Sequence, residues 1–390
     1  MLNLKEPDFP SSEQVVVNQR HLAAKTLFES LIKPSGIRVN GNQPYDIQVK
    51  NPKFYHRVIH QGNLGLGEAY MEGWWECERI DLFIEKLLQA KLERHVKNRL
   101  SLLWPLFITR YINLQTAIRA FAVAKQHYNI GNDLFEKMLD ESMAYSCAYW
   151  QQAETLQQAQ DAKMNLLCRK LKLEPGMKLL DIGCGWGGLA AYAAEHFSVS
   201  VTAITISNAQ FEYAVEKYKH LDICFKLQDY RDLNEHYDRI VSVGMLEHVG
   251  HKNYRRFMKK VDDCLAPQGL AVLHTIVDNT SNTTCNPWIN KYIFVNGVVP
   301  SVAQLSKAAE GLFVIEDIHN FGPDYAKTLM AWHDNFIASY PTLNATYDKR
   351  FYRMWRYYLL SCAGGFKARY MQLMQLVMSK NRADCYQSER

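Results

Sequence analysis

The chain has 390 residues, 48% of them hydrophobic and 22% charged, which is enough for two ordinary globular domains. No uncharged apolar run reaches the roughly 20 residues that a membrane-spanning helix needs, and the N-terminal residues do not read as a secretory signal. The net charge of +5 is uneven, because residues 1–120 and 346–390 are basic whereas 121–345 are acidic. Basic ends around an acidic body suggest an anionic partner, nucleic acid or phospholipid, although charge this modest also fits simple solubility.

The nine cysteines are dispersed, with no CxxC pair and no zinc-type spacing. Such a set is typical of reduced thiols inside a cell, and it predicts no metal site.

Residues 15–110 are expected to be mainly helical, with glycines 62, 65 and 67 marking turns. Trp74 and Trp75 follow directly, and a core position is the more frequent role for such residues. The segment 93–120 mixes basic and bulky apolar residues, as in a linker or an amphipathic surface helix. We therefore predict a smaller, mainly helical N-terminal domain over 1–115, serving lipid binding and dimerisation, and a catalytic domain over 116–390.

A short aromatic stretch, MAYSCAYW, precedes the strongest motifs of the chain and places Cys147 between tyrosines. A buried loop would explain it, because free cysteine is commonly a small buried hydrophobe. One wall of an active site would explain it as well.

From residue 177 the pattern changes to short β-rich apolar runs that alternate with helical stretches. This alternation predicts an α/β fold with a mostly parallel sheet covered on both faces and ligands at the carboxyl ends of its strands. Seven strands are expected, at 177–183, 199–207, 223–230, 238–245, 269–277, 313–322 and 371–379.

The first of these strands runs into a glycine-rich turn, LLDIGCGWGG. Gly183, Gly185 and Gly187 allow a sharp turn and a close approach of backbone to ligand, and Asp181 lies at the strand end. A dinucleotide fingerprint, G-x-G-x-x-G, is the obvious rival, but the spacing here is G-x-G-x-G-G.

The turn resembles that of the class I methyltransferases, which have a Rossmann-like fold and bind S-adenosylmethionine there. The resemblance implies that the methionine end of this co-substrate lies against the turn and that the ribose and adenine lie near the ends of the next two strands. It assigns Thr205 and Gln210 to the second strand end and Asp229 to the adenine amino group, with Tyr230 as a neighbouring flat face.

Further segments at 127–150, 245–254, 273–276, 286–301 and 320–332 follow in order. Together they resemble the cyclopropane-fatty-acyl-phospholipid synthases over nearly the whole chain. The resemblance implies methyl transfer from S-adenosylmethionine to the cis double bond of an acyl chain, through a carbocation, with a bicarbonate ion as the base. It implies that the ion is held by Glu247, His274, Tyr325, Cys147 and the backbone of Ile276, that Tyr145 and Ser146 touch the co-substrate, and that Cys362 lies in the active-site region.

Each of these residues, taken alone, also fits an ordinary role, such as a helix cap for Glu247 or a satisfied core position for His274. Two other functions stay open: methylation of another lipid or an isoprenoid without ring formation, and a nucleic-acid-binding module, although no target-base motif such as NPPY is present. The expected partner is an anionic phospholipid surface, not nucleic acid. The expected form is a homodimer in the cytoplasm, attached peripherally to the inner face of the membrane.

Overall fold

The computed structural model describes residues 12–91, 131–380 and 384–390, with side chains from residue 22 on. The chain divides into two compact units, Met1–Lys97 and Asn98–Arg390. The predicted linker at 93–120 and the predicted boundary at residue 115 lie outside the described residues. No helix among the described residues is long and apolar enough to cross a membrane.

The N-terminal unit is mainly helical, as expected. It contains α1 (Ser12–Ile32), η1 (Lys33–Ser35), α2 (Lys53–Met71) and α3 (Ile80–Gln89), with a two-stranded antiparallel ladder of β1 (Gln48–Val49) and β2 (Trp75–Glu76). Trp75 is fully buried at its centre, with ring centroids 6.2 Å from Phe54 and 5.3 Å from Phe83. The core role predicted for this tryptophan is therefore confirmed.

The prediction of turns at glycines 62, 65 and 67 was wrong, because all three lie within α2. Only Gly62 departs from helical geometry, with φ of 55°, and it kinks the helix. At Gly65 the absence of a side chain serves close packing instead, since a Cβ there would lie 2.6 Å from the carbonyl oxygen of Arg57. Sequence alone does not distinguish a glycine needed for a turn from one needed for close approach.

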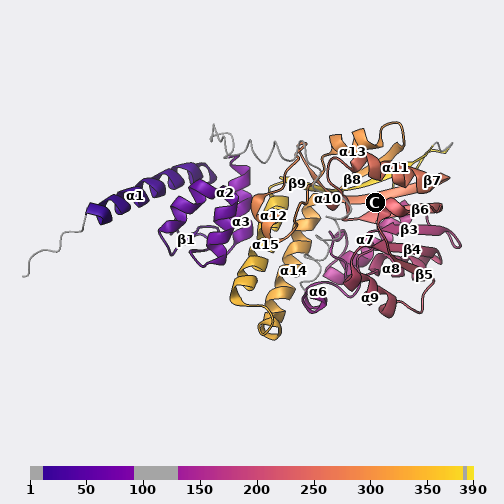
Figure 1. The fold of residues 1–390 in the computed structure, drawn as a ribbon, viewed down its shortest axis with the longest axis horizontal. Coiled ribbons are helices and arrows are strands. Elements are labelled where there is room, and N and C mark those ends of the chain that lie inside the picture. The colour runs from indigo at the N-terminus through magenta and orange to yellow at the C-terminus, as the bar shows by residue number, and fades with distance from the viewer. Residues whose placement is uncertain (1–11, 92–130, 381–383) are drawn as a thin grey trace, which may run out of the picture. The chain divides into compact units, whose positions relative to one another are not determined.

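The second unit is a three-layer α/β structure around a seven-stranded sheet, as predicted, with strand order β5-β4-β3-β6-β7-β9-β8 (Figure 1). The five strands β5, β4, β3, β6 and β7 are parallel to one another, whereas β9 is antiparallel to both β7 and β8. In chain order they are β3 (Lys178–Ile182), β4 (Ser200–Thr205), β5 (Ile223–Leu227), β6 (Tyr237–Val243), β7 (Leu265–Asp278), β8 (Val314–Asn320) and β9 (Met371–Ser379).

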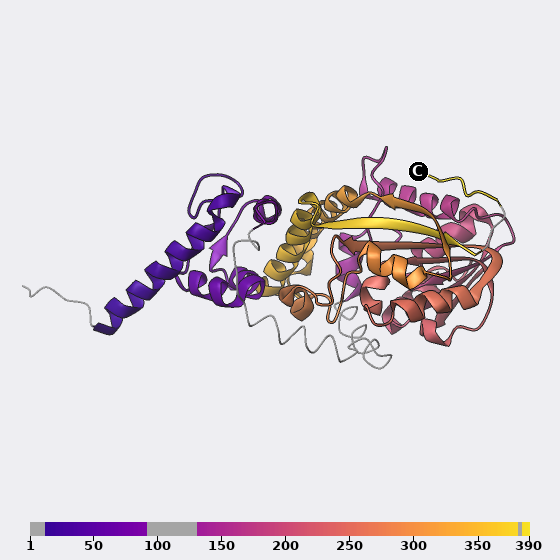
Figure 2. The same cartoon turned by 90° about the horizontal axis from the view of Figure 1, so that it is seen from above.

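Helices cover both faces of this sheet. Because successive side chains of a strand point to opposite faces, each strand contributes residues to a hydrophobic core on either side. On one face Leu180 and Ile182 of β3 pack with α11 (Tyr254–Cys264) and α13 (Val302–Ala309). On the other face Leu179 packs with α7 (Leu156–Lys170) and α8 (Gly188–Phe197), and α9 (Asn208–Lys217) lies beside β4 and β5. Figure 2 shows the same layers from above.

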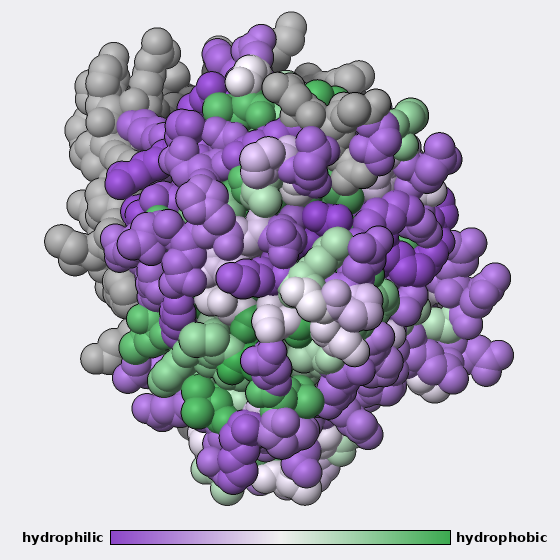
Figure 3. All heavy atoms as spheres, turned by 90° about the vertical axis from the view of Figure 1, so that its right-hand side faces the viewer, coloured by the Kyte–Doolittle hydropathy of each residue, from purple (hydrophilic) through white to green (hydrophobic). Residues whose placement is uncertain are grey.

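The remaining elements gather near the carboxyl ends of the parallel strands. They are α6 (Asn132–Met138), η4 (Tyr230–Asp232), α10 (Leu246–Val249), α12 (Pro287–Tyr292), α14 (Gly322–Leu343) and α15 (Lys349–Lys367). The long helices α14 and α15 pack against each other, and α14 also packs against α6 and β9. The face of the molecule in Figure 3 is largely hydrophilic, with a smaller group of hydrophobic residues toward its lower side.

Candidate active site

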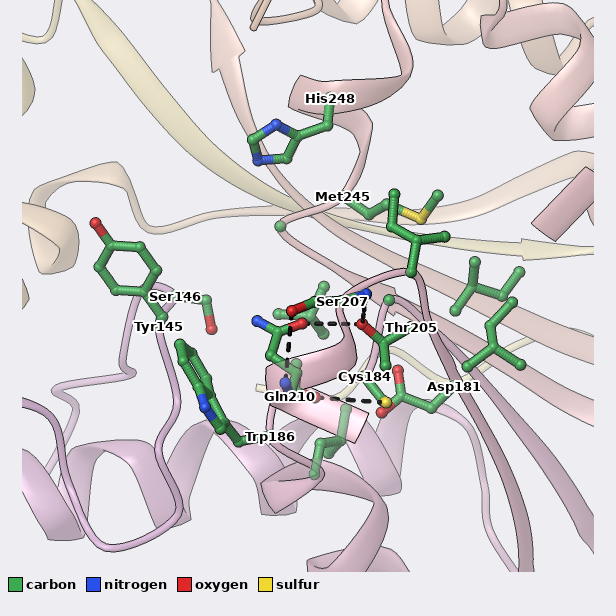
Figure 4. A pocket seen from close by; sticks show the side chains of 18 of the residues that line it. Tyr145, Ser146, Asp181, Cys184, Trp186, Thr205, Ser207, Gln210, Met245 and His248 are labelled. Atoms are coloured by element: carbon green, nitrogen blue, oxygen red, sulfur yellow. Dashed lines mark hydrogen bonds between the residues drawn. The ribbon is translucent and has the colours of Figure 1, made fainter. Parts of the chain in front are cut away.

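A cavity opens at the carboxyl ends of the parallel strands, where the sheet topology places ligands. It encloses about 1510 Å³ of empty space, its open mouth included. Of the ten residues predicted to bind the co-substrate, nine line this one cavity: Tyr145, Ser146, Asp181, Gly183, Gly185, Thr205, Gln210, Asp229 and Tyr230 (Figure 4).

The tenth residue, Gly187, does not line the cavity, but its backbone conformation allows the glycine-rich turn. Its φ of 88° lies in the left-handed region, and a Cβ there would come within 2.9 Å of the Phe225 ring. Gly183 and Gly185, with φ of 84° and 56°, form the stretch of backbone that borders the cavity. These conformations are open to glycine at little cost, which explains the motif.

Asp181, next to the last residue of β3, is a buried carboxylate, and neither of its oxygens has a hydrogen-bond partner among the described residues. Burial raises the pKa of Asp181 to about 7, and the charge of nearby Lys163 opposes this rise. An unpartnered buried carboxylate is costly to leave unsatisfied. Its position on the cavity wall suits a cationic group of a ligand, such as the ammonium of a methionine moiety.

The ends of β4 and β5 supply a second part of the wall. Thr205 Oγ1 donates to Gln210 Oε1 at 2.9 Å, which leaves the amide nitrogen of Gln210 turned to the cavity (Figure 4). Asp229 accepts from the backbone N–H of Arg231 at 2.9 Å and from its guanidinium at 2.7 Å. Both oxygens of Asp229 are thus already engaged, although each keeps a lone pair for a further donor such as an adenine amino group. Tyr230 is buried beside them.

A second group of predicted residues comes together from four separate segments of the chain. Cys147, Ile276 and Tyr325 pack in one hydrophobic cluster with Phe321, and His274 lies beside that cluster with its ring centroid 5.9 Å from Phe321. Glu247, at the start of α10, accepts the backbone N–H of Ile276 on Oε1 at 2.6 Å.

Burial perturbs the titration of each of these groups. It raises the pKa of Glu247 to about 6. It lowers the pKa of His274 well below its ordinary value, aided by Lys163 and Lys170, so the imidazole is neutral. It raises the pKa of the Cys147 thiol well above its ordinary value, aided by Asp324. Desolvation disfavours the charged form of each group, and strongly perturbed pKa values mark functional sites.

Two buried atoms at this cluster, Glu247 Oε2 and His274 Nε2, have no hydrogen-bond partner in the part of the chain that the structure describes. His274 Nδ1 lies 3.2 Å from the amide nitrogen of Gln375, a group that can only donate. Nδ1 is therefore the acceptor, and the hydrogen of the neutral ring resides on the unpartnered Nε2. The cluster thus offers one free acceptor and one free donor, which is what a protonated oxyanion requires.

Cys362 lies on α15. Burial raises the pKa of Tyr325 well above its ordinary value, and Cys147 and Cys362 add to this rise, so both thiols lie near its hydroxyl. Burial, with nearby Cys285, raises the pKa of Cys362 to about 12, so this thiol is neutral. All nine cysteines lie in the described ranges and are free. Among the described residues, the histidines, cysteines and acids form no cluster that could hold a metal ion.

Aromatic rings surround the space between the two groups. The hydroxyl of Tyr145 lies 2.8 Å from that of Tyr358, and its ring lies 5.1 Å from Trp332 and 5.2 Å from Phe135. Tyr325 stacks on Phe366 at 4.6 Å. Aromatic faces stabilise cations, so this part of the site suits a reaction in which positive charge develops.

The sequence interpretation missed several residues of the site. Lys163, Trp186, Arg231, His248 and Phe294 all line the cavity, and Gln375 contacts His274. Trp186, Arg231, His248 and Phe294 lie inside or directly beside motifs that the sequence analysis singled out, so a signal was present for them. Lys163 and Gln375 lie on a helix and an antiparallel strand without a local motif.

The model of the mycolic acid cyclopropane synthetase family matches residues 115–376. The chain is 52% identical over 350 residues to the cyclopropane-fatty-acyl-phospholipid synthase of Escherichia coli strain K12, covering 90% of this chain and 92% of the relative. It is 33% identical to a probable fatty acid methyltransferase of Pseudomonas putida, covering 87% and 88%.

Solved structures agree with this result. The cyclopropane synthase MmaA2 of Mycobacterium tuberculosis aligns with a TM-score of 0.64 at 29% identity, covering 69% of this chain and all of that one. The mycolic acid cyclopropane synthase CmaA1, in complex with SAH and CTAB, aligns with a TM-score of 0.63 at 32% identity, covering 67% and 98%. The chain therefore belongs to the mycolic acid cyclopropane synthetase family, and it is an S-adenosylmethionine-dependent methyltransferase with the class I fold.

Proposed function

We propose that this enzyme transfers the methyl carbon of S-adenosylmethionine to the cis double bond of unsaturated acyl chains in membrane phospholipids and closes a cyclopropane ring. The observation that carries the proposal is the pairing of a cavity suited to S-adenosylmethionine with a neighbouring buried cluster around Glu247 and His274. The Escherichia coli relative, whose name states a phospholipid product, supports the lipid class.

The residues present fit S-adenosylmethionine. The carboxylate of Asp181, which has no partner among the described residues, suits its ammonium, the amide N–H groups of Gln210 suit its ribose hydroxyls, and Asp229 and Tyr230 suit its adenine. When bound, S-adenosylmethionine supplies an electrophilic methyl group on a sulfonium. The chain's own task is to hold this group against the acyl chain and to keep water out.

The reaction balances as follows. The π electrons of the alkene form a bond to the methyl carbon, the carbon–sulfur bond breaks, and positive charge is left on the acyl chain. Loss of a proton from the new methyl group frees the C–H electron pair, which forms the second ring bond. The rings of Tyr145 and Tyr325 would stabilise the cation, and Glu247 contributes a fixed negative charge when ionised.

The base that removes this proton is the second part of the proposal. The residues present fit bicarbonate: Glu247 Oε2 would accept its hydroxyl hydrogen, and His274 Nε2–H and the Tyr325 hydroxyl would donate to its oxygens. The Cys147 thiol, which donates to the carbonyl oxygen of Ala148 at 3.2 Å, would line the same site. When bound, bicarbonate supplies a base of suitable strength beside the methyl group. The backbone N–H of Ile276, assigned to the ion by family resemblance, acts here through Glu247, to which it donates.

We also propose peripheral attachment to anionic phospholipid at the inner face of the cytoplasmic membrane. Lys349, Arg350, Arg353 and Arg356 alternate with aromatic residues along α15, which suits headgroups and acyl chains together. The N-terminal unit, residues 1–115 in our division, would assist lipid docking and form a homodimer. The exposed apolar side chains of Leu22 and Leu27 on α1 support such a contact. No nucleic-acid substrate is proposed.

The test is incubation of the purified full chain with vesicles of monounsaturated phospholipid, methyl-labelled S-adenosylmethionine and bicarbonate. The expected lipid product is heavier by one CH2, carries the label and lacks the double bond. Vesicles of saturated phospholipid are the matched control and should take up no label. A methylated chain without a ring, or label in no lipid at all, would contradict the proposal.

A further inference from the structure

Lys163 is a buried charged residue in the cavity wall that the reaction outlined above does not use. It lies on α7 with 2% of its surface exposed, and it lines the cavity beside Ser146 and Asp181. Its Nζ donates to Ser146 Oγ at 3.1 Å, and it has no other hydrogen bond or ion pair with the described residues. An ammonium has three N–H groups, so two are left unused. Lysine is almost never fully buried without a compensating partner.

The surrounding carboxylates act on Lys163 through space. Asp140, Asp161 and Asp181 favour its charged form, while burial lowers its pKa. Asp140 is itself engaged, because it accepts from the backbone N–H groups of Ser142 and Ala144. The direct partner of the ammonium is therefore a neutral hydroxyl rather than a carboxylate.

This contact constrains the Ser146 hydroxyl. Since Oγ accepts from Lys163, its own hydrogen must point away from the ammonium, and Ser146 borders the cavity. A hydroxyl donor backed by a buried positive charge suits a carboxylate.

We propose that Lys163 is a positioning residue for S-adenosylmethionine. Its ammonium orients the Ser146 hydroxyl toward the carboxylate of the methionine end and stabilises that negative charge. Asp181 is the complementary group for the ammonium of the same zwitterion. This inference rests on the proposed function, which places S-adenosylmethionine in this cavity.

The test compares two ligands on the full chain by calorimetry, S-adenosylhomocysteine and its decarboxylated analogue. In the wild type, loss of the carboxyl group should weaken binding about 10- to 100-fold, as for a hydrogen bond to a charged group. In Lys163→Met, which keeps most of the unbranched side chain and removes its charge, the same comparison should give a factor of only about 3 to 5, as for a neutral donor.

Lys170→Met is the matched control, because Lys170 is a second buried lysine on the same helix that does not line the cavity. It should keep the wild-type ratio between the two ligands. Ser146→Ala should reduce this ratio as Lys163→Met does, and the double variant should reduce it no further. If Lys163→Met fails to fold, Ser146→Ala alone still tests the route through the hydroxyl.

Three results would overturn the inference, and each would indicate a different role for Lys163 or a different ligand. Equal weakening of both ligands in Lys163→Met would make Lys163 a structural counter-charge. Unchanged affinities with a raised bicarbonate requirement would place its action at Glu247 and His274 instead. No binding of S-adenosylhomocysteine by the wild type would remove the proposed ligand itself.

Discussion

Replacing Glu247 by glutamine separates what this carboxylate does for catalysis from what it does for stability. Burial raises its pKa from 4.5 to about 6, and this difference corresponds to about 2 kcal/mol. Because the folded state binds the proton more tightly, Glu247 favours folding below pH 4.5, and this contribution is lost as the pH rises through about 6. Glutamine is neutral throughout, so Glu247→Gln should raise the free energy of unfolding by about 2 kcal/mol at pH 8. The gain should vanish below pH 4.5.

The same variant should lose most of its activity. An amide nitrogen in place of Oε2 is a donor, so it cannot accept the hydrogen of the proposed base, and turnover should fall at least about 100-fold. Affinity for S-adenosylhomocysteine should be unchanged, because Glu247 does not line that cavity.

Thermal melting at pH 8 and pH 4.5, calorimetry and the labelled-vesicle assay measure the three quantities. Glu235→Gln is the control, since Lys226 lowers the pKa of this exposed residue and its replacement should not stabilise the fold. A Glu247→Gln variant that melts no higher than wild type at pH 8, or that keeps a tenth of its turnover, would refute the reasoning.

Other perturbations have equally definite outcomes. Cys147→Ser should keep measurable turnover on vesicles, because the buried thiol is neutral and a hydroxyl can keep its contact with the carbonyl oxygen of Ala148. A bulky thiol reagent should inhibit the wild type, and a folded but inactive Cys147→Ser would argue for a covalent role. Asp229→Ala should weaken S-adenosylmethionine binding about tenfold in calorimetry and lipid binding much less, and unchanged affinity would remove its adenine role. Gln375→Leu, which frees Nδ1 of His274, should lower turnover about tenfold without changing S-adenosylhomocysteine affinity, and normal turnover would show that this contact does not orient the ring. Sedimentation with anionic vesicles should weaken as salt rises, whereas binding that is indifferent to salt would contradict an electrostatic contribution.

The sheet could be predicted from sequence because each strand carries its own signal. All seven expected strands are present, and their alternating residues divide between the two cores as a two-residue period requires. The first residue of β7 was harder to predict from sequence, since the strand begins at Leu265, four residues before the predicted start. The strand includes Pro267 and Gly269, two residues that disfavour strands, so the local sequence carries little signal for this part of it.

The residues of the site also differ in whether a local sequence pattern predicts them. The glycine turn and the residues at strand ends could be found because a parallel sheet brings the ends of distant strands to one edge. Lys163 and Gln375 could not, because each acts through one long-range contact. Lys163 reaches Ser146, 17 residues away, and Gln375 reaches His274 across 101 residues of chain. Such contacts follow from how helices and antiparallel strands pack, which no local pattern encodes.

The shifted pKa values of the groups around Cys147 have a common explanation if the acyl chain forms a carbocation during the reaction. A carbocation is captured by any strong nucleophile within reach, and a thiolate would be among the fastest. Burial keeps the Cys147 and Cys362 thiols protonated. The same desolvation leaves His274 neutral, with its hydrogen on the nitrogen that faces the cluster. The two thiols are thus held in their least reactive form, and the His274 nitrogen at the cluster carries a hydrogen instead of a lone pair, while aromatic faces remain to stabilise charge. If the proposed cation forms, the aromatic stretch around Cys147 would shield it, and the cysteine would act as a neutral wall residue whose thiol donates to Ala148.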